Sequence, residues 1–352
     1  MLYREVGQLK TSYAADQQIF PIRQDRLVVI ALLIVAFSVV PYVANDYWLS
    51  AILIPTLALS LAALGLNILT GYCGQLSLGT AAFMSVGGFA TFNLVTRLPE
   101  IPFPISLLLA GGIAGVVGVI VGLPSLRIKG FYLVVSTLAA HFFVQWLFDN
   151  VKWFKQNNPQ GEIKPPPLEL WGFVFNTPVR LYLLALVFVV SLAFLAKNMM
   201  RRSTGRRMMA VRDMDLAAAV MGVPIARTKL LAFAISGFYC GIAGALYVYC
   251  YLQLLDTKTY GLELAFSVMF MIIVGGMGTI AGSFIGAIII FLVPIWMNTT
   301  FSRYGIDPSQ IQNIAKIIFG TFVIFLLIVE PNGITRLWAT IREKLRNWPF
   351  PY

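Results

Sequence analysis

Long runs of apolar residues without charge recur along most of this 352-residue chain. An α-helix needs about 20 consecutive apolar residues to cross the hydrocarbon core of a bilayer. Runs of about that length can be delimited at 27–44, 48–70, 76–96, 103–124, 130–148, 180–196, 229–252, 262–275, 278–298 and 311–329. We therefore predict an all-α polytopic membrane protein with about ten transmembrane helices.

Composition supports this fold class. Apolar residues make up 59% of the chain and charged residues 12%, against about 45–50% and about 25% in soluble domains. The net charge is +11, but the aromatic residues lie inside apolar runs, which does not fit a nucleic-acid-binding surface. Cys73, Cys240 and Cys250 lie in or beside apolar runs, and their odd number argues against a disulfide framework.

The basic residues between the runs predict an orientation. Lys and Arg concentrate in cytoplasmic segments near the ends of spans. Here they concentrate in the N-terminal tail 1–26, the loops 124–130 and 197–229, and the C-terminal tail 336–352. Ten crossings of the transmembrane domain, residues 27–335, place all four segments on one side, so we expect both termini to be cytoplasmic. No cleavable signal peptide is expected, and the first span would serve as the insertion signal.

The longest loop predicted outside the membrane is 149–179. Pro165, Pro166 and Pro167 exclude a long helix there. The loop is either a contact surface for a soluble partner or an ordinary surface loop.

Polar side chains at membrane depth are costly and often mark a transport pathway. Glycines in the segment GYCGQLSLGTAAFMSVGGFA, beginning at Gly71, weaken a regular helix, so the 76–96 run is expected to be partly broken or re-entrant. Non-helical backbone at that depth must be covered by protein or line a water-filled cavity. The candidate pathway residues are Asn67, Gln75, Ser77, Thr80, Thr137, His141 and Gln145.

Thr137, His141 and Gln145 repeat every four residues and therefore share one face of a helix. This polar stripe either lines an aqueous path or makes hydrogen bonds between helices, and for any single residue we favour the hydrogen bonds.

Small residues also recur at four-residue spacing, which lets helix backbones approach closely. The examples are Gly111 and Gly115, Gly118 and Gly122, Gly237 and Gly241 with Ala245, and Gly278, Gly282 and Gly286. Two similar glycine groups, beginning at Gly71 and at Gly275, hint at an internal repeat.

The loop 197–229 is too polar to span a membrane. From Arg206 to Met221 it contains no Pro or Gly and is rich in Ala, which predicts one helix that ends at Gly222 and Pro224. A short basic helix of this kind either lies on anionic lipid or fits a groove on a soluble partner.

The segment GRRMMAVRDMDLAAAVMGVPIARTKLLAFAISGFYCGIAGALY, together with GYCGQLSLGTAAFMSVGGFA and IIVGGMGTIAGSFIGA, resembles blocks of the branched-chain amino-acid type of ABC permease. The blocks lie in matching order within about 48–335, and they are more similar to the LivM than to the LivH member of that family. The resemblance implies that 197–229 holds a coupling helix that docks into an ATPase. The corresponding residues are Gly205, Arg206, Arg207, Arg212, Asp213, Asp215, Ala217, Ala218, Gly222 and Pro224.

One departure concerns the general permease signature, in which Glu-Ala-Ala is followed three residues later by Gly. Here Leu216 stands in the Glu position, ahead of Ala217, Ala218 and Gly222, and Asp215 lies one place early.

The resemblance further implies a second, related permease subunit, two ATP-binding cassette subunits and a periplasmic substrate-binding protein, in the inner membrane of a bacterium. The chain has no G-x-x-x-x-G-K-[ST] motif, so ATP and Mg²⁺ are expected on the ATPase subunits, with no cofactor or metal on this chain. The expected substrate is a branched-chain or other apolar amino acid, with urea, short amides and aromatic acids as alternatives.

Two other classes of membrane protein fit the sequence less well. An ion-driven transporter or channel would need charged residues inside the spans, and these are almost absent, with Glu263 and Lys316 near span ends. A membrane enzyme would need a reactive cluster, and the sequence offers a single histidine and scattered cysteines.

Overall fold

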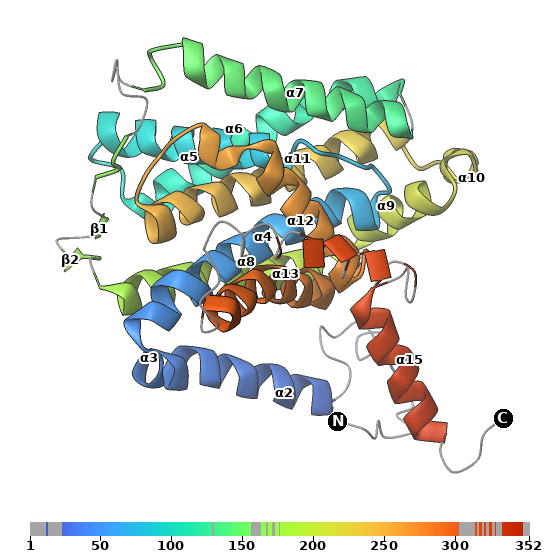
Figure 1. The fold of residues 1–352 in the computed structure, drawn as a ribbon. Coiled ribbons are helices and arrows are strands. Elements are labelled where there is room, and N and C mark those ends of the chain that lie inside the picture. Colours follow the sequence, from blue (N-terminus) through green and yellow to red (C-terminus); the bar gives the residue numbers. More distant parts are fainter. Residues whose placement is uncertain are drawn as a thin grey trace.

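The computed structural model describes residues 12, 23–128, 130–155, 163–166, 168–170, 173–175, 177–302, single positions between 314 and 328, and 333–347. Within these residues the chain is a bundle of long helices that lie side by side (Figure 1). Most of the predicted span 311–329, most of the N-terminal tail and the last residues of the C-terminal tail lie outside the described residues.

The first half of the bundle consists of helices and short π- or 3₁₀-helical continuations. They are α2 (Arg23–Ile34), η1 (Val35–Val39), α3 (Val40–Val43), η2 (Trp48–Leu53), α4 (Ile54–Asn67), η3 (Ile68–Tyr72), α5 (Thr80–Arg97), α6 (Phe103–Gly122), η4 (Leu123–Leu126) and α7 (Phe131–Asn150). A short antiparallel hairpin of β1 (Glu169–Leu170) and β2 (Phe173–Val174) follows.

The second half begins at α8. It comprises α8 (Pro178–Arg201), α9 (Ser203–Asp213), α10 (Asp215–Val220), α11 (Ile225–Leu246), η5 (Tyr247–Leu252), η6 (Lys258–Tyr260), α12 (Leu262–Gly275), α13 (Ile280–Ser302) and α15 (Ile334–Asn347).

Most of the predicted spans are present as membrane-length helices. Eight stretches of the described residues are long and apolar enough to cross a bilayer: Arg26–Val43, Trp48–Tyr72, Phe103–Leu126, Phe131–Asn150, Pro178–Arg201, Ile225–Leu252, Thr257–Gly275 and Ile280–Met297. The predicted run 76–96 corresponds to α5, which is 18 residues long and richer in Gly, Ser and Thr. The all-α polytopic fold class is confirmed, with the count of about ten as an approximation.

The centre of the bundle is formed by α4 and α11. Nearly every residue of α4 is buried, and α11 packs against α4, α5 and α6. In contrast, α2 and α7 lie on opposite margins of the bundle (Figure 1), with large apolar side chains such as Leu32 and Phe143 exposed. Apolar side chains on an exposed margin suit contact with lipid tails or with another membrane helix.

Close helix packing uses the small residues that the sequence pointed to. A Cβ added to Gly118 of α6 would lie 2.5 Å from the carbonyl oxygen of Phe233, and one added to Gly237 of α11 would lie 2.5 Å from that of Ala114. A larger residue at either position would force α6 and α11 apart. The predicted close approach is confirmed for this helix pair.

The bundle has two distinct ends, seen at the right and left of Figure 1. We call them the α10 end, which carries α9 and α10, and the hairpin end, which carries β1 and β2. A pocket at the α10 end is lined jointly by residues of 74–76, 130–133 and 211–216. The loops 124–130 and 197–229 therefore lie together, as their basic composition predicted.

The prediction of one helix from Arg206 to Met221 is wrong. The segment forms α9 and α10, separated at Met214, whose φ of −155° and ψ of 100° are extended. The break has a tertiary cause, because α9 packs against α8, α11 and η3, while Asp215 places its negative charge in the first turn of α10, where the helix dipole favours it. Gly222 ends the segment with φ of +82°, as predicted.

Replacing Gly118 by Ala tests the α6–α11 contact. We expect the melting temperature of the purified protein in detergent to fall, because the added methyl group overlaps the Phe233 carbonyl at a cost of about 1–3 kcal/mol. The control is Gly112→Ala on the same helix, where nothing lies within 4 Å of an added Cβ, so the better helix propensity of Ala should leave stability equal or slightly higher. Equal melting temperatures for the two variants would contradict the contact.

Candidate functional site

The α10 end contains a joint between two helix breaks that are distant in the sequence. Asn67, at the end of α4, donates hydrogen bonds from Nδ2 to the carbonyl oxygen of Thr279 at 2.7 Å and to Oγ of Ser283 at 2.9 Å. Its Oδ1 accepts a hydrogen bond from the Gly278 amide at 2.8 Å. One side chain therefore attaches the end of α4 to the turn between α12 and α13.

Arg212 of α9 reaches into the same joint. Its Nη1 donates a hydrogen bond to the carbonyl oxygen of Gly71 at 2.9 Å, and its Nε pairs with Oδ1 of Asp213 at 2.9 Å. Gly74, with φ of +71°, and Gly278, with φ of +78°, both face Arg212, since a Cβ at either position would lie within 3.2 Å of its side chain. The arginine thus connects the loop 197–229 to both helix breaks.

Glycine is needed at both turns for a geometric reason. Positive φ values are strained for residues with a Cβ, and a Cβ on Gly71 would overlap the backbone of Gly278. The two glycine groups that hinted at a repeat therefore lie directly against each other.

The remaining residues predicted for coupling lie around this joint. Arg206 and Arg207 are exposed on α9, while Gly205 is buried where α9 turns back against Met200. On α10, Ala218 is buried and Ala217 is exposed. Gly222 and Pro224 are exposed in the connection to α11, and Asp215 is partly buried at the start of α10.

Apolar side chains on α10 and beside it are largely exposed. Met214 is 70% exposed, Leu216 77%, Val220 90% and Met221 85%. Large apolar side chains gathered on an otherwise charged segment are typical of a contact surface for another molecule. We call these four residues the α10 apolar patch.

The predicted pathway residues fall into two groups. Ser77, Thr80, Thr137 and His141 lie where the non-helical segment before α5 meets α7: the Leu78 amide donates a hydrogen bond to Oγ1 of Thr137 at 3.1 Å, and all four side chains are buried. Asn67 belongs instead to the joint described above, which separates it from this group.

The polar stripe of α7 makes two contacts with other elements. Besides the Leu78 contact of Thr137, Nε2 of Gln145 donates a hydrogen bond to the carbonyl oxygen of Tyr260 at 3.2 Å. The preferred interpretation of the stripe as hydrogen bonds between segments holds for these two residues. Within the described residues, His141 and Thr80 have buried polar atoms without a hydrogen-bond partner.

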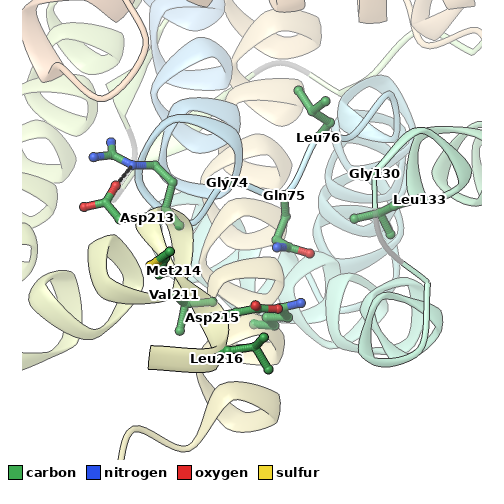
Figure 2. A pocket seen from close by; sticks show the side chains of 12 residues that line it. Gly74, Gln75, Leu76, Gly130, Leu133, Val211, Asp213, Met214, Asp215 and Leu216 are labelled. Carbon is green, nitrogen blue, oxygen red and sulfur yellow. Dashed lines mark hydrogen bonds and ion pairs between the residues drawn. The ribbon is translucent and has the colours of Figure 1, made fainter. Parts of the chain in front are cut away.

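Gln75 lies apart from both groups, in the pocket at the α10 end. This pocket has a volume of about 420 Å³. Figure 2 shows Gly74, Gln75 and Leu76, from the segment before α5, above Met214, Asp215 and Leu216. The start of α7 and Lys229 of α11 complete the lining. Lys229 was not among the predicted site residues, because in the sequence it reads as one more basic residue at the edge of a loop.

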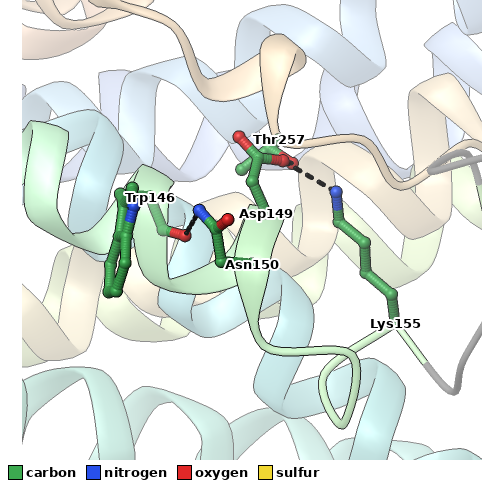
Figure 3. A network of polar contacts seen from close by, with 5 residues as sticks. All are labelled: Trp146, Asp149, Asn150, Lys155 and Thr257. Atoms are coloured by element: carbon green, nitrogen blue, oxygen red, sulfur yellow. Dashed lines mark hydrogen bonds and ion pairs between the residues drawn. The ribbon is translucent and has the colours of Figure 1, made fainter.

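A second polar network fastens the hairpin end. Asp149, at the end of α7, accepts hydrogen bonds at Oδ1 from Nζ of Lys155 at 2.7 Å and from Oγ1 of Thr257 at 2.6 Å (Figure 3). Ile163 pairs with Leu255 through a β-bridge. The loops 149–179 and 253–261, which the topology places on one side, are therefore joined to each other.

These features define a class of protein. The chain is a multi-span helical membrane protein with broken helices at one end, and its exposed α9–α10 segment is bonded to these breaks. The chain belongs to the family described as branched-chain amino acid transport system / permease component, whose model matches residues 48–328. The family resemblance seen in the sequence is confirmed, and the chain is a LivM-like permease of the ABC import type.

Several curated permeases are similar over much of the chain. The high-affinity branched-chain amino acid transport system permease protein LivM of Escherichia coli K12 is 26% identical over 315 residues, which cover 83% of this chain and 71% of that protein. The probable LivM of Methanocaldococcus jannaschii is 23% identical over 319 residues, covering 78% and 89%. The autoinducer 2 import system permease protein LsrC of Enterobacter sp. strain 638 is 28% identical over 210 residues, covering 55% and 59%. No solved structure matches the chain significantly.

Replacing Asn67 by Leu tests the joint. We expect a large loss of thermal stability, because the substitution leaves the partly buried Gly278 amide and the other groups bonded to Asn67 without partners, at about 1–3 kcal/mol for each unsatisfied group. Gln75→Leu is the control, since its single printed hydrogen bond, to the Cys73 carbonyl, is 3.5 Å long. If Asn67→Leu melts at the same temperature as Gln75→Leu, the joint does not hold the two breaks together.

Proposed function

We propose that this chain is one permease subunit of an ATP-driven importer for branched-chain or other apolar amino acids. It forms half of the translocation pathway with a second, related permease subunit. Two ATPase subunits bind ATP and Mg²⁺ at the α10 end, which faces the cytoplasm of a bacterial cell, and a periplasmic binding protein delivers substrate at the hairpin end. The family and the names of the relatives support the transport class and the choice of substrate.

The observation that carries the proposal is the α10 apolar patch. Leu216 and Val220 are 77% and 90% exposed on a loop too polar to enter the hydrocarbon core. Burying two such side chains against a partner would contribute about 1.5–3 kcal/mol each. A short helix that presents apolar anchors suits a groove on another protein, and the ATPase is the partner that an ABC permease requires on this side.

Arg212 gives the docked segment a mechanical connection to the bundle. A shift of α9 carries the Arg212 guanidinium with it, and the guanidinium holds the Gly71 carbonyl and packs beside Gly278. ATP binding that favours one position of the docked segment therefore favours one arrangement of the helix breaks. We infer alternating access driven in this way, with the breaks rearranging between the two states.

Reconstitution tests the function directly. The chain, expressed with a related second permease, ATPase and binding-protein subunits, should co-purify with the ATPase and move leucine across proteoliposomes only when ATP is present. The reason is that the energy comes from differential binding of ATP to the two states. Leucine movement that persists after the ATPase is omitted, or that follows an ion gradient, would overturn the proposal.

Arg212→Met tests the connection. We expect the ATPase to remain bound and to hydrolyse ATP while leucine transport per ATP falls about tenfold or more, because a hydrogen bond from a charged group is worth about 1.5–3 kcal/mol. The control is Arg202→Met, at an exposed position directly before the same helix and outside the predicted coupling residues, whose side chain makes no hydrogen bond or ion pair within the described residues. Equal transport per ATP in the two variants would show that Arg212 does not transmit the motion.

A further inference from the structure

A lysine side chain lines the pocket at the α10 end. Lys229, in the first turns of α11, is only 3% exposed and lines the pocket. Its ammonium makes no hydrogen bond and no ion pair within the described part of the chain. An ammonium that borders an open pocket and has no protein partner there can pair with an anionic group that enters from outside.

Neither Cys73 nor Asp213 supplies that anion. Cys73 lies close enough to Lys229 for the ammonium to lower the pKa of its thiol, but burial has the larger effect and raises that pKa to about 11. The thiol is therefore neutral at physiological pH. The Asp213 carboxylate is engaged with Arg212.

The rest of the lining has the composition of a small-molecule site. Leu76, Leu133, Val211 and Leu216 provide apolar surface, and Asp213 and Asp215 bring negative charge to the same pocket as Lys229. Its volume of about 420 Å³ lies within the range of about 300–1,000 Å³ typical of ligand pockets. An apolar amino acid has matching features: a carboxylate, an ammonium and an apolar side chain.

The pocket also lies on the expected route. Gln75 lines it, and the buried polar residues Ser77 and Thr80 follow on the same segment. Residues 211–216 of the α9–α10 segment form one wall, so a movement of that segment changes the shape of the pocket.

Building on the proposed function, we propose that this pocket is a release-side site in which Lys229 binds the carboxylate of the transported amino acid before it leaves toward the ATPase side. The α9–α10 wall then makes affinity at this site depend on the state of the ATPase. Lys229 is a binding residue for substrate, distinct from the residues that transmit the motion.

The test uses the complete transporter in proteoliposomes, with leucine transport measured while L-leucine or L-leucinamide is added on the ATPase side. Leucinamide keeps the side chain and the amine but lacks the carboxylate. We expect leucine to inhibit transport by occupying the release-side site, and leucinamide to inhibit at least tenfold more weakly, because it cannot make the charge-assisted bond. Lys229→Met should raise the half-inhibitory leucine concentration about tenfold and leave that of leucinamide unchanged.

Two further variants complete the design. Arg227→Met changes an exposed position two residues away, and this variant should be inhibited by leucine and leucinamide as the wild type is. Lys229→Arg should still be inhibited more strongly by leucine than by leucinamide. Equal inhibition of the wild type by leucine and leucinamide would overturn the proposal, and this comparison holds even if Lys229→Met fails to assemble. Loss of ATPase binding by a Lys229→Met permease with an unchanged melting temperature would also overturn it, since the carboxylate would then come from the ATPase. A wild-type complex that does not transport leucine with ATP would refute the proposed function itself.

Discussion

Backbone groups that leave a helix at membrane depth must find hydrogen-bond partners within the protein, because the hydrocarbon core offers none. This chain meets the requirement with side chains from distant elements. Asn67 accepts from the Gly278 amide, Thr137 accepts from the Leu78 amide, and Arg212 donates to the Gly71 carbonyl. Each helix break is therefore fastened to a different part of the fold, and the breaks become points where movements of separate elements are joined.

The same fastening explains why the α9–α10 segment is positioned as it is. A helix on a loop with no contact to the bundle could dock to a partner without moving anything. Here Met208 and Val211 bury the inner face of α9, Arg212 holds the Gly71 carbonyl, and the apolar residues left over on α10 face outward. One short segment thus divides its side chains between an exposed apolar patch, where we propose that the ATPase binds, and the contacts with the helix breaks.

The features that can be predicted from the sequence are those that depend on neighbouring residues along the chain, such as the length of an apolar run or the spacing of small residues. Apolar run length predicted most spans, and four-residue spacing predicted the close α6–α11 contact at Gly118 and Gly237. The break at Met214 was missed because helix propensity is summed along the chain and does not register the packing of α9. Lys229 was missed for a similar reason: a basic residue at the edge of a span normally reports on topology, and only the fold shows that this one is buried beside a pocket.

The position of Lys229 also bears on how substrate would be released from the proposed release-side site. A site that bound a carboxylate equally well in every state would slow release, because a ligand shifts an equilibrium only by its difference in affinity between states. Lys229 is fixed on the central helix α11, whereas residues 211–216 of the opposing segment belong to the part that we propose docks to the ATPase. A pocket with one fixed charged residue and one movable wall can bind the amino acid in one state and weaken its grip in the other.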